Sequence, residues 1–204
     1  VPIPILGLDL AIESALLGTL MLTTVLFVPF WLWMSRVTNK RSAYIAGMLF
    51  WVTMQFVIFT VQPGEINKML ILCVLLGIGL SSAYVLPDSM FPDIIEWDEL
   101  RTGRRQEGIY YGARAFIRKM ASALVVFLTL QLLGWAGYVA PPDDAAIYTQ
   151  SESVLNMIRL LVSPFGAIML SGAILCAWFY PLDREKYKKI RELLEKRKEK
   201  LPAE

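Results

Sequence analysis

Acidic and basic side chains gather in residues 88–107, and their spacing suggests ion pairs that join the ends of helices. Asp88 follows a proline, which frees a backbone carbonyl, and Asp93 and Glu96 share one face of any helix that continues past Pro92. Carboxylates close to a hydrocarbon layer are costly without a role. One interpretation is a set of pairs that breaks when helices separate, and the other is an exposed loop whose charges contribute little. The remaining candidates for such pairs are Glu99, Arg105 and Glu107.

A second polar set lies in residues 111–122, where basic side chains interrupt an apolar stretch. Arg118 and Lys119 point about 100° apart around a helix. Small residues share the Lys119 side, which lets a helix or a cavity come close. We expect Lys119 to face a bundle interior, with Tyr111 and Ser122 completing the set; the alternative is that it extends to water at the membrane boundary. Arg118 is expected to reach lipid headgroups or the acidic segment.

Several kinds of catalytic site are absent from the sequence. The chain has no histidine, and Cys73 and Cys176 lie in apolar runs, as buried small side chains rather than metal ligands or a disulfide. The sequence contains no glycine-rich phosphate loop and no pattern that reads nucleic acid. We therefore expect no enzyme, no metal site and no organic cofactor.

The elements that must position these residues are apolar helices. Hydrophobic residues make up 56% of the chain and charged residues 19%, and the mean hydropathy is +0.51, which is typical of a membrane protein. Five runs reach the ~20 residues that cross a bilayer, and they do not alternate as barrel strands do. These runs are 15–34, 43–62, 69–90, 109–139 and 156–180. The prediction is an all-α, polytopic membrane helix bundle over residues 1–182.

The distribution of basic residues predicts the orientation of this bundle. They concentrate in the first and third links between runs and in the tail after Pro181, whereas the other two links carry only Lys68. The positive-inside rule then places the tail in the cytoplasm, below a plasma or inner membrane. Residues 183–204 are expected to form a charged amphipathic helix on the membrane surface, near anionic lipid. Expected interfacial anchors are Trp31, Trp33, Trp97, Trp135, Tyr138, Trp178 and Tyr180.

Three segments resemble the glycoside-pentoside-hexuronide:cation symporter family, which belongs to the major facilitator superfamily. The most specific is Pro87-Asp88-Ser89-Met90-Phe91-Pro92-Asp93-Ile94-Ile95-Glu96-Trp97-Asp98-Glu99, with its continuation through residues 101–112. The basic turn at 30–41 is similar to the family's link between helices eight and nine. Tyr180-Pro181-Leu182-Asp183 with its charged tail is similar to the end of helix twelve. The resemblance covers residues 13–200.

This resemblance implies a partial major facilitator fold, with helices eight to twelve present and the N-terminal helices missing as partners. The family's helix-eleven lysine falls on Lys119, near its cation and sugar sites. The cation site itself, for Na⁺ or H⁺, would lie mostly in the missing half. The family's cytoplasmic closing network falls on Asp93, Glu96, Glu99, Arg105 and Glu107, to which we add Arg118. Arg118 beside the lysine departs from the family pattern and bears on the substrate.

Three functions follow as expectations. The first is cation-coupled symport of a sugar or glycoside by alternating access, with Lys119, Asp88, Tyr111 and Ser122 at the substrate and coupling site. The second is a lysophospholipid/cation symporter of the same fold. The third is a non-transporting membrane fragment that binds a partner. In each case the lipid bilayer surrounds the chain, and no nucleic acid is involved.

Overall fold

The computed structural model describes residues 10–58, 65–139, 151–182 and 184–200, which are almost entirely helical and contain no strand. Five helical segments in this part of the chain are long and apolar enough to cross a membrane, which confirms the all-α bundle. They are Ser14–Val37, Lys40–Ile58, Ile66–Thr102, Glu107–Trp135 and Glu152–Trp178. The helices within them are α1 (Leu10–Leu26), α2 (Val28–Val37), α3 (Lys40–Ile58), α4 (Ile66–Thr102), α5 (Glu107–Trp135), α6 (Glu152–Leu160) and α7 (Gly166–Trp178), followed by α8 (Arg184–Lys200).

Two of the five segments are interrupted, each near a proline. The first divides at Phe27 into α1 and α2, and a proline lies in the first turn of α2, where its missing N–H costs least. The last contains a π-helical turn, Leu161–Phe165, with Pro164 inside it. The Ser163 hydroxyl in this turn is buried and donates to the Gln55 carbonyl of α3 at 2.6 Å. The interrupted helix is therefore held to its neighbour by a polar contact.

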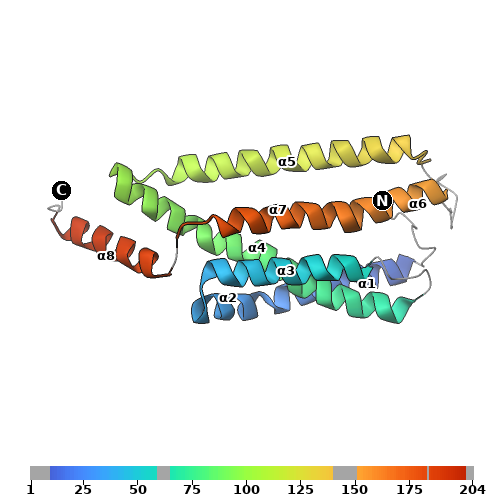
Figure 1. Ribbon diagram of the computed structural model, residues 1–204, viewed down its shortest axis with the longest axis horizontal. Helices are drawn as coiled ribbons and strands as arrows, with labels where there is room; N and C mark the ends of the chain where they lie inside the picture. Colours follow the sequence, from blue (N-terminus) through green and yellow to red (C-terminus); the bar gives the residue numbers. More distant parts are fainter. Residues whose placement is uncertain (1–9, 59–64, 140–150, 183, 201–204) are drawn as a thin grey trace.

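Helix α4 crosses the molecule diagonally and packs against α1, α2, α3 and α8 (Figure 1). It continues twelve residues beyond Met90, where the apolar pattern had placed its end. Pro87 and Pro92 lie inside it, because each removes only one donor from the helical ladder. Gly103 ends the helix with φ of 74°, and its N–H donates to the Glu99 carbonyl.

The core around α4 depends on the close approach of α3 to α4 and on one buried indole ring. A Cβ on Gly79 would lie 2.8 Å from the Trp51 Cβ, so only glycine allows α3 and α4 to come this near. Trp31 is 4% exposed and donates its indole N–H to the Ile78 carbonyl at 2.8 Å. It packs with Ala43 and Leu86, and is therefore a core residue rather than the interfacial anchor expected from its position near a run end.

Helices α5 and α8 attach to this core in different ways. Helix α5 runs along one edge of the molecule and leaves most of its length exposed (Figure 1). Helix α8 buries Ile190 and Leu194, with Leu182, against Ile94 and Trp97 of α4. The tail was expected to form a charged amphipathic helix on the membrane surface. Its apolar side chains cover the end of α4, since the longer α4 supplies an apolar surface there.

Candidate functional site

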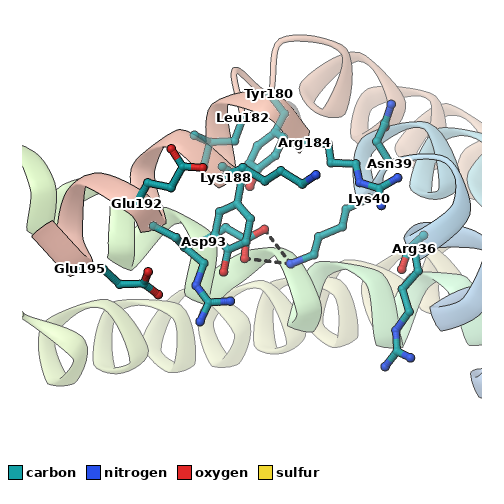
Figure 2. A pocket seen from close by; sticks show the side chains of 13 residues that line it. Arg36, Asn39, Lys40, Asp93, Tyr180, Leu182, Arg184, Lys188, Glu192 and Glu195 are labelled. Atoms are coloured by element: carbon teal, nitrogen blue, oxygen red, sulfur yellow. Dashed lines mark hydrogen bonds and ion pairs between the residues drawn. The ribbon is translucent and has the colours of Figure 1, made fainter.

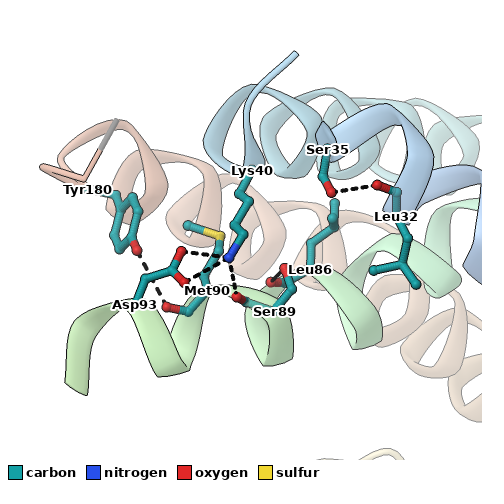
Figure 3. A network of polar contacts seen from close by, with 8 residues as sticks. All are labelled: Leu32, Ser35, Lys40, Leu86, Ser89, Met90, Asp93 and Tyr180. Carbon is teal, nitrogen blue, oxygen red and sulfur yellow. Dashed lines mark hydrogen bonds and ion pairs between the residues drawn. The ribbon is translucent and has the colours of Figure 1, made fainter. Parts of the chain in front are cut away.

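The most buried charge in the described residues is Asp93, which lies on α4 and pairs with Lys40 at the first position of α3. The Lys40 ammonium is 2.8 and 2.7 Å from the two carboxylate oxygens of Asp93. It also donates to the Ser89 carbonyl at 2.7 Å, so its three donors are all used (Figure 3). We call this set of three residues the Lys40–Asp93 site. A buried carboxylate needs such compensation, because desolvation of a lone charge costs several kcal/mol.

The chain after α7 covers the Lys40–Asp93 site. The Tyr180 hydroxyl donates to the Met90 carbonyl of α4 at 3.5 Å (Figure 3). The Tyr187 ring of α8 lies 5.2 Å from the Lys40 ammonium, and its phenol lies near enough to Asp93 to feel the charge of that carboxylate. Burial, together with the charge of Asp93, raises the pKa of Tyr187 to about 12. The Tyr187 side chain is therefore in its neutral, protonated form when α8 packs on α4.

A second set of ion pairs lies one turn further along α4, at the link to α5. The Arg105 guanidinium is 3.5 Å from a Glu99 oxygen and donates to Glu107 at 2.8 Å. One carboxylate oxygen of Glu96 and one of Glu99 are buried without a hydrogen-bond partner in the described part of the chain. A cavity of about 80 Å³ lies between these groups and Arg191 of α8. Asp93, Glu96, Glu99, Arg105 and Glu107 therefore lie together at one end of the bundle.

Asp88 and Arg114 connect α4 to α5. They form an ion pair, and the Arg114 guanidinium lies 4.8 Å above the Phe91 ring. Tyr111 packs edge-to-face on the same ring, with 5.1 Å between centroids. A groove of about 400 Å³ runs along this junction and is lined by aromatic and aliphatic carbons as well as by the Arg114 and Arg118 side chains. Asp88 is thus an exposed, paired carboxylate, whereas Asp93 lies on the packed face of α4 and is buried.

The remaining candidates lie apart from the Lys40–Asp93 site, on α5. Lys119 and Ser122 are exposed, since α5 turns this face away from the other described helices. Arg118 lines the groove and forms no ion pair with the described acidic residues. Arg118 lies eleven residues after Glu107, about 16 Å further along α5. This distance separates Arg118 from the other residues predicted for the gate.

Two residues of the site were missed in the sequence. Lys40 lies in the basic turn at 30–41, which the sequence analysis used only for orientation and for the family resemblance, and Tyr187 lies in the tail that was expected only to form an amphipathic helix. No local pattern connects Lys40 to a carboxylate 53 residues away. The Tyr180-Pro181 motif was a usable signal, because it places an aromatic hydroxyl just before the tail helix.

The described helices form a bundle that is long and apolar enough to cross a membrane, with an ion pair at one end. Residues 5–184 match the family described as MFS/sugar transport protein, and the chain belongs to that family. It is therefore an integral membrane protein of a transporter family and not an enzyme.

Three relatives illustrate the range of this family. The chain is 34% identical to an uncharacterized symporter of Synechocystis sp., covering 92% of this chain and 34% of that protein. It is 29% identical to a putative sulfoquinovose importer of Escherichia coli, covering 79% of this chain and 33% of the importer. It is 26% identical to a sodium-dependent lysophosphatidylcholine symporter of Danio rerio, covering 84% of this chain and 31% of the relative. The chain thus spans about a third of the length of the curated relatives it matches.

Proposed function

We propose that this chain is the C-terminal part of a secondary active transporter that couples uptake of a sugar or glycoside to Na⁺ or H⁺ by alternating access. It would form the last five of twelve helices and would pair with N-terminal helices from the same transporter. The observation that carries this proposal is the Lys40–Asp93 site, a buried ion pair at one end of the bundle. Such a pair stabilises one arrangement of helix ends and is lost in another, as a gate requires.

The gate in this proposal combines the Lys40–Asp93 site with the second set of ion pairs. Asp93 would hold the start of α3, while Glu96, Glu99, Arg105 and Glu107 would hold the link between α4 and α5. Arg118 would join them when α5 moves toward the cytoplasmic end. The basic residues of this end, together with the tail, support a cytoplasmic location for the gate and for the C-terminus.

The substrate and coupling site would lie on the exposed face of α5, between the two halves of the transporter. Lys119 would pair with a carboxylate of the other half, because an ammonium facing a membrane cavity needs a partner. Tyr111 and Ser122 would donate to the solute, and Asp88 would hold α5 in place through Arg114. The open face of α5 supports this location, since an apolar helix this exposed requires a further helix or lipid to cover it.

A second candidate function is symport of a lysophospholipid. The groove between α4 and α5 favours it, because an apolar channel beside Arg114 and Arg118 suits an acyl chain with a phosphate. The lysophosphatidylcholine symporters among the relatives support the same alternative. A non-transporting fragment that binds a partner is the third, and it would show no uptake with any solute.

Uptake assays distinguish these functions. The intact transporter in proteoliposomes should accumulate a glycoside when a Na⁺ or H⁺ gradient is applied, and collapse of the gradient should abolish accumulation. Uptake of lysophosphatidylcholine in place of the glycoside would select the second function. A Lys119→Ala variant should lose gradient-driven uptake while still inserting into the membrane, and Lys68→Ala, far along the chain from this site, is the matched control. Normal uptake by Lys119→Ala would reject the role of this lysine.

A further inference from the structure

A cavity of about 470 Å³ lies beside the Lys40–Asp93 site, and the Lys40 and Asp93 side chains form part of its wall (Figure 2). It is bounded by the end of α2, the start of α3, α4 and the covering segment of α8. Its cationic side chains are Arg36, Lys40, Arg184, Lys188 and Arg191, and its carboxylates are Asp93, Glu192 and Glu195. Among the lining residues that the structure describes, cationic groups therefore outnumber acidic groups, and the space is large enough for a phosphate with its substituents.

The charges are not mixed evenly within this cavity. Figure 2 shows Glu192 and Glu195 at the end of the cavity away from Arg36 and Arg184. Glu192 is eight residues after Arg184, about 12 Å along α8. Asp93 is already neutralised by Lys40. Among the described residues, no carboxylate lies within ion-pair distance of Arg36 or Lys188. One end of the cavity is therefore positive and can accept an anion.

The start of α8 adds to this positive end. Arg184 is the first residue of the helix and lines the cavity, so the partial positive charge of a helix N-terminus adds to the side chains. Asn39 also lines the cavity and supplies an amide group next to Lys40. Arginine, lysine, amide and helix N-terminus together form the usual donor set for a phosphate.

Exposed aromatic residues place this cavity at the depth of lipid headgroups. Trp33 is 61% exposed and lies one turn before Arg36, while Phe179 is 81% exposed and precedes Tyr180 of the lining. Trp178 is also exposed, and the Arg41 guanidinium lies 5.6 Å from its ring. Exposed aromatic side chains at the ends of membrane helices mark the interface between hydrocarbon and water. An anion that reaches this cavity from the bilayer would have its acyl chains beside these rings.

We propose that this cavity binds the headgroup of an anionic phospholipid, with Arg36, Arg184 and Lys188 on the phosphate. The lipid would link the turn between α2 and α3 to α8, the two elements that enclose the Lys40–Asp93 site. A basic pocket between membrane helices at the cytoplasmic side is a known form of lipid site. The aromatic belt distinguishes a lipid from a soluble phosphate as the occupant, because a soluble ligand gains nothing from it.

The test is native mass spectrometry of the intact transporter with phosphatidylglycerol, phosphatidylcholine and inorganic phosphate as separate probes. Phosphatidylglycerol should remain bound in preference to phosphatidylcholine. An Arg36→Gln, Arg184→Gln double variant should bind phosphatidylglycerol about 30-fold more weakly, since each basic residue near an anionic lipid contributes about a factor of five. The control double variant is Arg104→Gln, Lys189→Gln, which removes the same charge from exposed positions outside the cavity and should bind normally.

A second pair of substitutions separates loss of the site from loss of the fold. Arg36→Lys with Arg184→Lys keeps both charges and should retain most of the binding. Equal loss in the cavity and control variants would overturn the proposal, as would unchanged binding in the cavity variant. Inorganic phosphate that displaces phosphatidylglycerol at low concentration would assign the cavity to a soluble anion and also overturn it. Lipid binding is measured without transport, so its result is independent of the uptake assays.

Discussion

The ion pair between Lys40 and Asp93 gives a sharp prediction, because its two members differ in exposure. The Asp93 side chain is 7% exposed, whereas that of Lys40 is 33% exposed. Replacing Lys40 with Met leaves a buried carboxylate without its cation. Replacing Asp93 with Asn leaves an ammonium that still bonds the Ser89 carbonyl and can reach water. The two single substitutions should therefore have unequal costs.

Lys40→Met should lower the free energy of unfolding by about 3–5 kcal/mol, the cost of leaving a buried charge unpaired. Asp93→Asn should lower it by about 1.5–3 kcal/mol, the contribution of hydrogen bonds to a charged group. The double variant Lys40→Met, Asp93→Asn removes both charges and should be more stable than Lys40→Met alone. The pair is thus expected to be strongly non-additive.

The assay is denaturant unfolding of the purified protein in detergent, followed by tryptophan fluorescence, with the four proteins of the cycle compared at one pH. A Lys68→Met variant serves as control, because Lys68 pairs with Glu65 in an exposed position. Its effect should be within about 0.5 kcal/mol of the original protein. Equal costs for Lys40→Met and Asp93→Asn, with a double variant that equals their sum, would refute the assignment of Asp93 as a buried charge compensated by Lys40.

Two further predictions concern packing around the same end of the bundle and within it. The pKa of Tyr187 is raised from 10 to about 12 when α8 packs on α4, so the contribution of Tyr187 to this packing is complete below pH 10 and is lost as the pH rises toward 12. Trp97 fluorescence should report this step, and Tyr187→Phe should remove it. A step that is unchanged in Tyr187→Phe would assign the transition to another group. Gly79→Ala places a Cβ 2.8 Å from Trp51 and should cost about 1–3 kcal/mol in thermal unfolding. Gly134→Ala, which meets no atom within 4 Å, should be neutral or stabilising, and equal effects at the two positions would contradict the close packing of α3 on α4.

The fold class and part of the candidate site were accessible from the sequence. Each apolar run is a local property, because crossing a bilayer requires about 20 consecutive apolar residues wherever the neighbours lie. The acidic segment was also visible, because Asp93 and Glu96 stand out at the end of an apolar run. Helix ends were less accessible. The apolar run ends at Met90, and only the packing of α8 on the last turns of α4 shows why the helix continues.

What remained hidden is the choice of partners between distant segments. The sequence places several carboxylates near the end of α4, and their spacing says that some share a face, but not which of them is buried. Asp93 is buried because the start of α3, Tyr180 and Tyr187 all meet α4 near that turn. That meeting depends on how closely α3 approaches α4 at Gly79, and on α8 folding back. The length of an apolar run depends only on consecutive residues and can be counted in the sequence. The desolvation of one charge and its neutralisation by another arise only when separate helices pack together.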